Sequence, residues 1–522
     1  MKRFLLFAAI AVLALAVVSC PDGNNDDIYL GDTGNYHAPP PVVTPPPDSR
    51  VFVITSPYGG IDWETIGRYR AAMHTHSTNS DGSLSLPDAI QRHYDLGFDI
   101  MAITDHVWRR LAGRVSGQEC FRDLLTTWPT QTEWPGWNNP EHASFPTTPP
   151  PDMVPLTHIS QAVKDAIQAG THPVSPNAHG LNFLPRDGRG MIFIPGTAEL
   201  APGSGGPNEE AAEANVFFWG YDMGTNNFRY DFVLPANASR RPPPAWISPW
   251  NTVRAGIQTA HDIGALAIIV HPGRTTGGAA YDLGAIHSPT NPSNMPRWIN
   301  HYTEMYLDFP ITTLVGMEIF NRRDGDSRHD RVLWDQVLTR TVPTGRFIWG
   351  FANDDSHSDG PTGSSSIGTN VNVFLMPENT LENIHSTMIG GNFYMQTHIA
   401  RNEGIDVGGS HPFGGHLNNA NLPSIVSITV AQSPYYTITV VAENAERIDW
   451  ITGGGQGYAG RTIMTVTGGP GSSTRDGTRV TSTLPLTHDF IDFQVGVYVR
   501  ANIIGINNHG IALTQPIGTR RN

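Results

Sequence analysis

The stretch "YRAAMHTHSTNSDGS", residues 69–83, places an apolar run directly before two histidines that stand one residue apart. Alternate residues of a strand point to the same side, so His74 and His76 can present two imidazoles to one ion. Asp81 follows in the same stretch and offers a carboxylate. The stretch therefore predicts a strand that ends in metal ligands.

Five further apolar runs of strand length also end in residues that can bind metal. The runs are "FDIMAITDH", "GMIFIPGTAE", "ALAIIVHPGR", "LVGMEIFN" and "RFIWGFANDDSH", and the residues that they carry are Asp105, His106, Glu199, His271, Glu318, Asp355 and His357. Helical stretches such as 85–97 and 250–264 lie between some of these runs, and repeated strand and helix indicate parallel strands. The carboxyl ends of parallel barrel strands share one face, so we expect these side chains to converge there.

The types of these residues suit a transition-metal centre. Imidazole and carboxylate ligands together favour zinc, manganese or iron over calcium. The carboxylate of Glu199 can bridge two cations. Two or three divalent ions in such a site would activate a water molecule and clamp an anionic substrate.

The motifs "HTHSTNSDG", "ITDH", "PGTAE", "VHPGR", "GMEIFN" and "DDSH", in this order, resemble those of the PHP (polymerase and histidinol phosphatase) domain. The resemblance covers residues 68–397. It implies an α/β fold with a distorted seven-stranded (β/α) barrel, up to three metal ions and hydrolysis of phosphate esters.

The resemblance also implies three sets of ligands. They are His74, His76, Glu199 and Asp355; then Asp81, His106 and His357; then Glu199 and His271. The third set has a gap, because Asn215 stands where the family commonly places a histidine. A neutral amide is a poorer ligand than imidazole, so the third ion is expected to be weak, solvent-rich or absent. Glu318 is interpreted either as a ligand or as a structural carboxylate, and Asp105 as a residue that orients a ligand.

The amino terminus predicts export and anchoring. Lys2 and Arg3 precede an apolar run that ends in "VVSC" at Cys20, and this pattern is typical of a signal peptide. The last residues resemble the lipobox of bacterial lipoproteins, so residues 1–20 are interpreted as a lipoprotein signal peptide. Lipidation of Cys20 would anchor an extracytoplasmic protein to a bacterial membrane. Residues 21–50 are rich in proline and predict a tether.

The rest of the chain predicts two domains. Residues 51–400 carry the PHP-like motifs, with a long insertion at 107–190 that is expected to lie over the site as a lid or substrate platform. Its histidines, at 142, 158, 172 and 179, are interpreted as surface or hydrogen-bonded residues. From 405 to 522, alternating apolar and polar runs between glycine-rich turns predict a small antiparallel β-sandwich.

Composition excludes several other classes of protein. The formal net charge of −14 argues against an extended nucleic-acid-binding surface. Once Cys20 is lipidated, Cys120 is the remaining cysteine, so neither a disulfide within the chain nor a thiolate zinc site is expected. The sequence contains no P-loop and no GxSxG nucleophile elbow.

The expected reaction is hydrolysis of a small phosphorylated molecule, a nucleotide or an oligonucleotide end by a metal-activated hydroxide. Glu199 would bridge the ions, and Arg274 would grip phosphoryl oxygens, a role for which Arg322 and Arg323 are also candidates. Two alternatives stay open at this point. One is an amidohydrolase, whose barrels use a comparable pair of histidines, and the other is a non-catalytic surface module that binds metal for stability.

Overall fold

The computed structural model of the chain describes its regular elements and the segments around them. The described residues are 52–106, 108–110, 119–121, 157–175, 186–200, 213–228, 253–272, 295–322, 327–358, 367–398, 422–432, 436–453, 460–468, 475–486 and 495–521. Contacts divide the chain into Met1–Pro47 and Asp48–Asn522. The signal peptide, Cys20 and the tether lie outside the described residues, as does most of the insertion.

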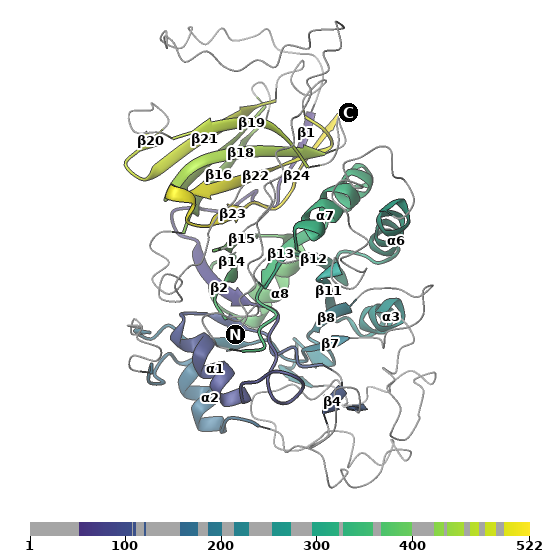
Figure 1. The fold of residues 1–522 in the computed structure, drawn as a ribbon, viewed down its shortest axis with the longest axis vertical. Coiled ribbons are helices and arrows are strands. Elements are labelled where there is room, and N and C mark those ends of the chain that lie inside the picture. The colour runs from purple at the N-terminus through teal and green to yellow at the C-terminus, as the bar shows by residue number, and fades with distance from the viewer. Residues whose placement is uncertain are drawn as a thin grey trace, which may run out of the picture. The chain divides into compact units, whose positions relative to one another are not determined.

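The motif-bearing strands fall into two sheets (Figure 1). One contains, side by side, β14 (Asn370–Met376), β2 (Gly67–Ala72), β3 (Ile100–Met101) and β6 (Ile192–Phe193). The other has the order β13 (Trp349–Asn353), β12 (Leu314–Asn321), β11 (Leu266–Val270), β8 (Glu213–Phe217) and β7 (Ala198–Leu200). Isolated bridges join the sheets at Thr75 with Ser356 and at His106 with Glu199.

The direction of the strands differs from the expectation at two places. Strands β2, β3 and β6 are parallel to one another, and so are β11, β12 and β13. Strand β8, however, is antiparallel to both β7 and β11, and β14 is antiparallel to β2. The chain is mixed α/β with several sheets, and the predicted seven-stranded barrel is not confirmed by the described strands.

The run "GMIFIPGTAE" was expected to form one strand, and that prediction is wrong. It is interrupted by Pro195 and Gly196, and the two pieces, β6 and β7, belong to different sheets. Gly196 has a φ of +58°, and a Cβ there would lie 2.3 Å from the carbonyl oxygen of Trp219. Proline and a left-handed glycine end strand pairing, so the chain crosses from one sheet to the other at this point.

The helices begin and end where the sequence supplies caps. In α1 (Leu86–Asp95) the side chain of Ser85 accepts a hydrogen bond from the backbone of Asp88, which satisfies an otherwise unpaired N–H group. Helix α8 (Leu381–Gly390) ends at Gly391, a left-handed glycine with a φ of +72°. The remaining long helices are α2 (Gln161–Gln168), α3 (Val253–Ile263), α6 (Met295–Asp308) and α7 (Ser327–Thr341).

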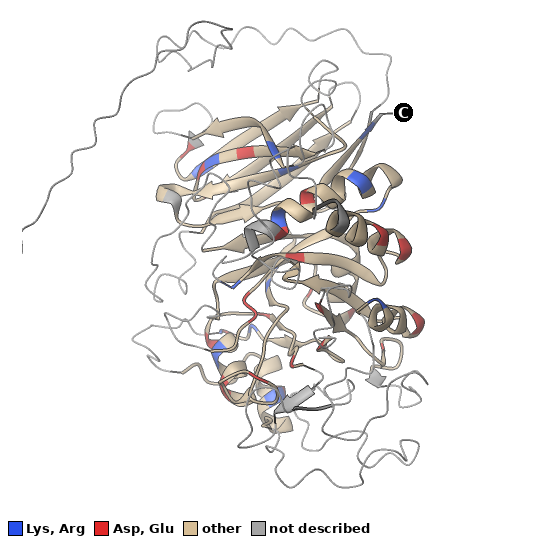
Figure 2. Ribbon diagram, turned by 45° about the vertical axis from the view of Figure 1, so that its right-hand side comes forward, with Lys and Arg blue, Asp and Glu red and all other residues tan. Residues whose placement is uncertain are grey.

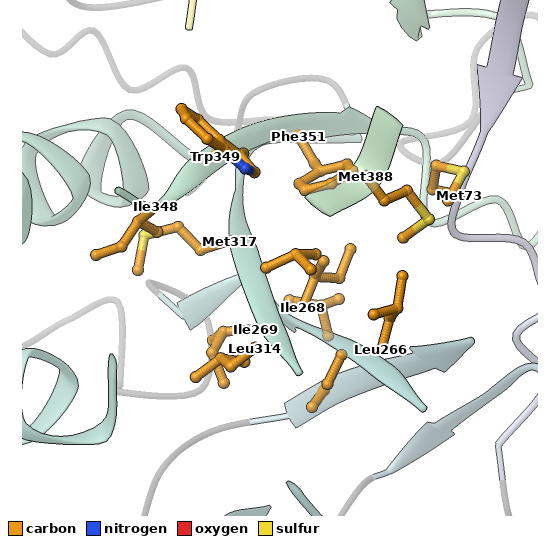
Figure 3. Close-up of a cluster of buried hydrophobic side chains, with 14 of the residues drawn as sticks. Met73, Leu266, Ile268, Ile269, Leu314, Met317, Ile348, Trp349, Phe351 and Met388 are labelled. Atoms are coloured by element: carbon orange, nitrogen blue, oxygen red, sulfur yellow. The ribbon is translucent and has the colours of Figure 1, made fainter. Parts of the chain in front are cut away.

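The apolar core of the motif-bearing half lies between β11, β12, β13 and the elements around them (Figure 3). Ile268, Met317 and Phe351, one from each strand, are fully buried, and Met73 reaches the same cluster from the end of β2. Each buried side chain of this size contributes about 1.5–3 kcal/mol to folding. Helices α3 and α7 pack against these strands, and α6 packs against α7 (Figure 1). This packing fixes the strands whose carboxyl ends carry the motifs.

The carboxy-terminal strands are antiparallel and form two layers. One layer has the order β16 (Ser424–Ala431), β17 (Thr437–Glu443), β21 (Arg479–Pro485) and β20 (Arg475–Asp476). The other comprises β18 (Ala445–Gly453), β19 (Arg461–Thr467), β22 (Tyr498–Gly505), β23 (Ile511–Leu513) and β24 (Ile517–Arg521), with β1 (Phe52–Thr55) at its edge. Trp450 is buried between the layers and donates a hydrogen bond to Ser482 Oγ at 2.8 Å.

This second layer continues into the sheet that carries β2. Strand β23 pairs with β15 (Phe393–Thr397), which pairs with β14. A buried cluster adds a second link, because Asp335 of α7 accepts hydrogen bonds from Tyr498 and Arg500 of β22. The carboxy-terminal strands therefore support the same sheet from which His74 and His76 emerge.

The hairpins β4 (Trp108–Arg110) with β5 (Glu119–Phe121), and β9 (Tyr221–Asp222) with β10 (Asn227–Phe228), lie apart from these sheets. Basic and acidic residues are interspersed along the described ribbon (Figure 2). Among the described helices, none is both long and apolar enough to cross a bilayer.

Candidate metal centre

The eight residues predicted as metal ligands converge on one place. They come from the segments that follow β2, β3, β11 and β13 and from β7 itself: His74, His76, Asp81, His106, Glu199, His271, Asp355 and His357. All eight belong to groups of side chains whose ligand atoms lie within 4.8 Å of one another. Residues separated by almost three hundred positions thus form one cluster, as expected for strand ends that share a face.

The first donor group consists of His74, His76, Glu199 and Asp355. His74 Nε2 lies 3.0 Å from His76 Nε2, 3.3 Å from Glu199 Oε2 and 3.5 Å from Asp355 Oδ1. His76 Nε2 lies 3.0 Å from the same Glu199 oxygen and 3.3 Å from the same Asp355 oxygen. Four ligands at about 2.0–2.1 Å around a tetrahedral zinc ion are about 3.3–3.4 Å apart. The donor atoms therefore have the spacing of a metal coordination shell.

The second donor group consists of Asp81, His106 and His357. Asp81 Oδ2 lies 3.2 Å from His357 Nε2 and 3.5 Å from His106 Nε2. The ring of His76 stacks on that of His357 with centroids 4.3 Å apart. His76 Nδ1 lies 3.4 Å from Asp81 Oδ1. His106 Nδ1 is 3.3 Å from Glu199 Oε2, so the second group shares a border with the first.

The third donor group contains a residue that sequence reasoning missed. His271 Nε2 lies 3.3 Å from Glu199 Oε1 and 3.3 Å from Glu213 Oε2. Glu213 is the first residue of β8. Because β8 is antiparallel to its neighbours, its beginning lies at the same edge as their ends. Asn215, the residue expected to leave a gap, points instead to the backbone and donates to the carbonyl of Met73 at 3.2 Å.

Loop residues 77–83 hold the Asp81 side of the centre in place. Asp105 is fully buried and accepts hydrogen bonds from Ser77 Oγ and Ser80 Oγ, both at 2.7 Å. Ser80 Oγ in turn lies 3.5 Å from His76 Nδ1. The expected orienting role of Asp105 therefore runs through two serines of the loop, which sequence reasoning did not identify.

Glycine is required at position 82 of this loop. A Cβ there would lie 2.7 Å from the backbone carbon of His76 and 2.7 Å from the nitrogen of Ser77. The amide of Gly82 also donates to the carbonyl of Ser77 at 2.9 Å. A side chain would force the backbone of His76 to move, which explains the glycine after Asp81.

Backbone strain accumulates where three adjacent strands reach the centre. His271 after β11, Arg322 after β12 and Asp355 after β13 have φ values of +27°, +52° and +47°. Positive φ is costly for residues with a side chain, and such strain persists where the surrounding structure imposes it. Here it turns two donor side chains, those of His271 and Asp355, into the cluster.

The electrostatic environment demands positive charge. Burial disfavours the charged form of His76, but Asp355 and Glu199 outweigh it and raise its pKa to about 10. Burial acts the same way on His271, yet Glu199 and Glu213 raise its pKa to about 9. Burial would raise the pKa of Glu199, but the imidazoles of His106 and His74 hold it well below the usual range. Ionised carboxylates packed this closely require protons or metal cations beside them.

Of the three arginines considered for substrate binding, Arg322 lies within the described residues. Arg322 is partly exposed, and its Nε donates to Asp355 Oδ2 at 2.7 Å. Burial lowers the pKa of its guanidinium, but Asp355 outweighs that effect and raises it. Arg274 and Arg323 lie outside the described residues. Arg322 therefore touches the first donor group through one of its carboxylates.

The histidines of the insertion do not join the cluster where they are described. His158 is exposed, and His172 Nε2 lies 2.7 Å from Gln91 Oε1. Neither belongs to a group of possible metal ligands among the described residues. His142 and His179 lie outside the described part of the chain.

No family model and no curated protein matches the chain. A solved structure that is similar is that of a two-domain protein from Bacteroides vulgatus ATCC 8482, which contains a predicted PHP-like metal-dependent phosphoesterase. Its identity to this chain is 12%, with a TM-score of 0.35 over 87% of this chain and 96% of that chain. This likeness is too weak to support a function, which therefore depends on the residues of the centre themselves.

Proposed function

We propose that the chain is a metal-dependent hydrolase of phosphate esters. The observation that carries this proposal is the first donor group, whose buried nitrogen and oxygen atoms have the separations of a metal coordination shell. Imidazole nitrogens that face each other at 3.0 Å, with carboxylate oxygens at 3.0–3.5 Å, are spaced for a shared cation.

Glu199 supports a centre with more than one ion. Its Oε2 faces His74 and His76, whereas its Oε1 faces His271. Oε1 is buried and has no hydrogen-bond partner in the described part of the chain, although buried carboxylate oxygens are normally paired. A carboxylate with its two oxygens in different donor groups suits two cations.

Phosphate esters fit the charge of such a centre. Divalent ions in the three donor groups would offset the charge of the carboxylates Asp81, Glu199, Glu213 and Asp355, and would offer positive charge directly to the oxygens of an anionic substrate. When bound, such ions lower the pKa of water and neutralise charge on phosphoryl oxygens.

The residues of the chain then have separate tasks. The imidazoles and carboxylates of the three donor groups hold the ions. Arg322 fixes the orientation of Asp355 and, from its partly exposed position, offers its remaining N–H groups to the substrate. Arg274 stays a proposed contact to phosphoryl oxygens. The substrate is proposed to be a small phosphorylated molecule, a nucleotide or an oligonucleotide end.

The test is a comparison of substrates on chain stripped of metal and then reloaded with zinc or manganese. The probes are p-nitrophenyl phosphate, bis-p-nitrophenyl phosphate and a p-nitroanilide. We expect metal-dependent cleavage of a phosphate ester that Glu199→Gln abolishes and that Glu64→Gln, an exposed residue outside the centre, leaves unchanged.

Other outcomes identify the alternatives. Cleavage of the anilide alone would favour the amidohydrolase. Bound metal without cleavage of any ester would favour the non-catalytic module. Near-normal phosphatase activity in Glu199→Gln with metal still bound would contradict the proposed role of the centre.

A separate proposal concerns location. Residues 1–20 support a lipoprotein signal peptide, with lipidation at Cys20 anchoring the protein to a bacterial membrane. Cys20→Ser should move the protein from the detergent-extracted membrane fraction to the soluble fraction. A wild-type protein that is already soluble after processing would contradict the anchor.

A further inference from the structure

The third donor group differs from the others in the chemistry of its ligands. Strand register places Glu213 opposite Val270, one residue before His271, and Asn215 opposite Glu199. Glu213 and Asn215 are two positions apart and share a face of β8. Asn215 is used by the backbone of Met73, so Glu213 is the β8 side chain that reaches the centre.

The result is a group of two carboxylates and one imidazole. His271 Nε2 lies 3.3 Å from each carboxylate, and the buried Glu199 Oε1 beside it has no hydrogen-bond partner within the described residues. The second donor group, with the adjacent His76, has the opposite composition of three imidazoles and one carboxylate. Nitrogen ligands suit zinc, whereas oxygen ligands suit manganese and magnesium.

Glu213 gives the third group access to solvent. Its side chain is 27% exposed, whereas those of Glu199 and His271 are 1% and 3% exposed. Asp81 and His357 of the second group are exposed to a similar degree, 22% and 21%, so the type of ligand atom is what distinguishes the two groups. An ion beside Glu213 can therefore keep water molecules among its ligands. Hard cations with octahedral shells retain water in this way, while a closed tetrahedral shell of protein ligands is typical of zinc.

We propose that Glu213 is a metal ligand and that the third donor group favours Zn²⁺ over Mn²⁺ less strongly than the other two groups do, so that the centre holds two kinds of metal when zinc is scarce. This rests on the proposed function, in that it requires the cluster to be a metal centre. Zinc binds most sites more tightly than manganese. The selectivity is therefore relative: limiting zinc fills the nitrogen-rich groups first and leaves the third group to manganese.

The experiment measures metal content rather than activity. Metal-stripped chain receives excess Mn²⁺ together with Zn²⁺ that a chelator holds at a low free concentration, excess metal is removed by gel filtration, and elemental analysis gives the ions per chain. Electron paramagnetic resonance reports bound Mn²⁺ independently. We expect wild type to retain both metals and Glu213→Gln to lose manganese, with at least about tenfold weaker Mn²⁺ binding, because even residues that only orient ligands change affinity about 10–100-fold.

Glu213→His gives the sharper comparison. It makes the third group nitrogen-rich, so manganese should fall and zinc should rise by the same number of ions. Glu64→Gln is the matched control and should keep the wild-type ratio. Circular dichroism tests whether each variant is folded. We expect both variants to fold, because the side chain of Glu213 is partly exposed.

The outcomes separate this inference from the proposed function. Wild-type chain that binds no metal would contradict both. Chain that binds only zinc, or a Glu213→Gln variant that retains manganese at wild-type affinity, would overturn the inference and leave the metal centre in place.

Discussion

His74 Nδ1 lies 2.7 Å from Glu318 Oε1, and both side chains are fully buried. The same carboxylate accepts hydrogen bonds from Asn353, from Asn321 and from the backbone of His271. Glu318 therefore accepts four hydrogen bonds while its partner histidine turns Nε2 toward the first donor group. Of the two roles that the sequence left open, these contacts favour an orienting carboxylate over a metal ligand, because both oxygens of Glu318 are occupied by donors.

Glu318→Gln should weaken metal binding by about 10–100-fold. Nδ1 of His74 and the amide of His271 both donate to Glu318 and need an acceptor. A glutamine amide would place an N–H donor against one of them. Isothermal titration of the stripped chain with Zn²⁺ measures the change. Glu64→Gln serves as the control, and an unchanged dissociation constant in Glu318→Gln would contradict the orienting role.

Gly82→Ala should lower both stability and metal affinity. The added methyl group would meet the backbone of His76 at 2.7–2.8 Å, and such overpacking costs about 1–3 kcal/mol. Gly59→Ala is the matched control, since a Cβ there meets one atom at an ordinary 3.5 Å. Thermal unfolding and zinc titration of both variants measure the effects, and equal behaviour of the two would show that the loop tolerates a side chain.

His93 should make stability depend on pH. Burial, with Arg92 adding to it, lowers its pKa from 6.5 to about 4 despite the hydrogen bond to the carbonyl of Ala89. The unfolded chain therefore binds a proton at His93 that the folded chain does not. Stability from this group is complete above pH 6.5 and is lost as the pH falls toward 4, by about 2 kcal/mol between pH 7 and pH 5.

The measurement is urea unfolding at both pH values for wild type and His93→Gln. The variant should lose about 2 kcal/mol less than wild type on acidification, while exposed His158→Gln should behave as wild type does. Because the histidines of the three donor groups are present in all three proteins, their own titration cancels in the comparison. Equal losses in wild type and His93→Gln would contradict the effect.

The buried pair of Asp335 and Arg500 should hold the carboxy-terminal strands on α7. Asp335→Asn leaves the guanidinium without its charged partner and should cost about 3 kcal/mol of unfolding free energy, with unchanged metal content in the folded chain. Asp335→Leu combined with Arg500→Met should cost less than Asp335→Asn alone. Chemical denaturation measures both, and a loss below about 1 kcal/mol in Asp335→Asn would show that the link is weak.

Much of the centre could be predicted because its residues follow apolar runs of strand length. The convergence of His74, His271 and Asp355 needs only the rule that strand ends share a face. Glu213 could not be found in this way, because it stands at the beginning of a strand, and the direction of β8 depends on its pairing with β7 and β11. The sequence did contain one signal for Glu213: it stands two residues before Asn215, and residues two apart on a strand share a face.

Some features of the fold could likewise be predicted from local sequence, whereas others depend on contacts between distant residues. The caps of α1 and α8 are local, and both helices appear where Ser85 and Gly391 indicate. Pro195 and Gly196 were also a local signal, in this case for the end of a strand. The apolar residues on either side nevertheless favoured the interpretation of the run as one strand. Pairing of β23 with β15 joins residues more than a hundred positions apart, and no local pattern encodes such a partner.

The most direct test of the metal centre is the number of transition-metal ions that the purified chain binds. Elemental analysis, before and after stripping and reloading, should find two or more ions per chain. A double variant, His74→Ala with His76→Ala, should lose at least one of them while remaining folded. A wild-type chain that carries no zinc, manganese or iron as purified, and that binds none on reloading, would contradict the metal centre.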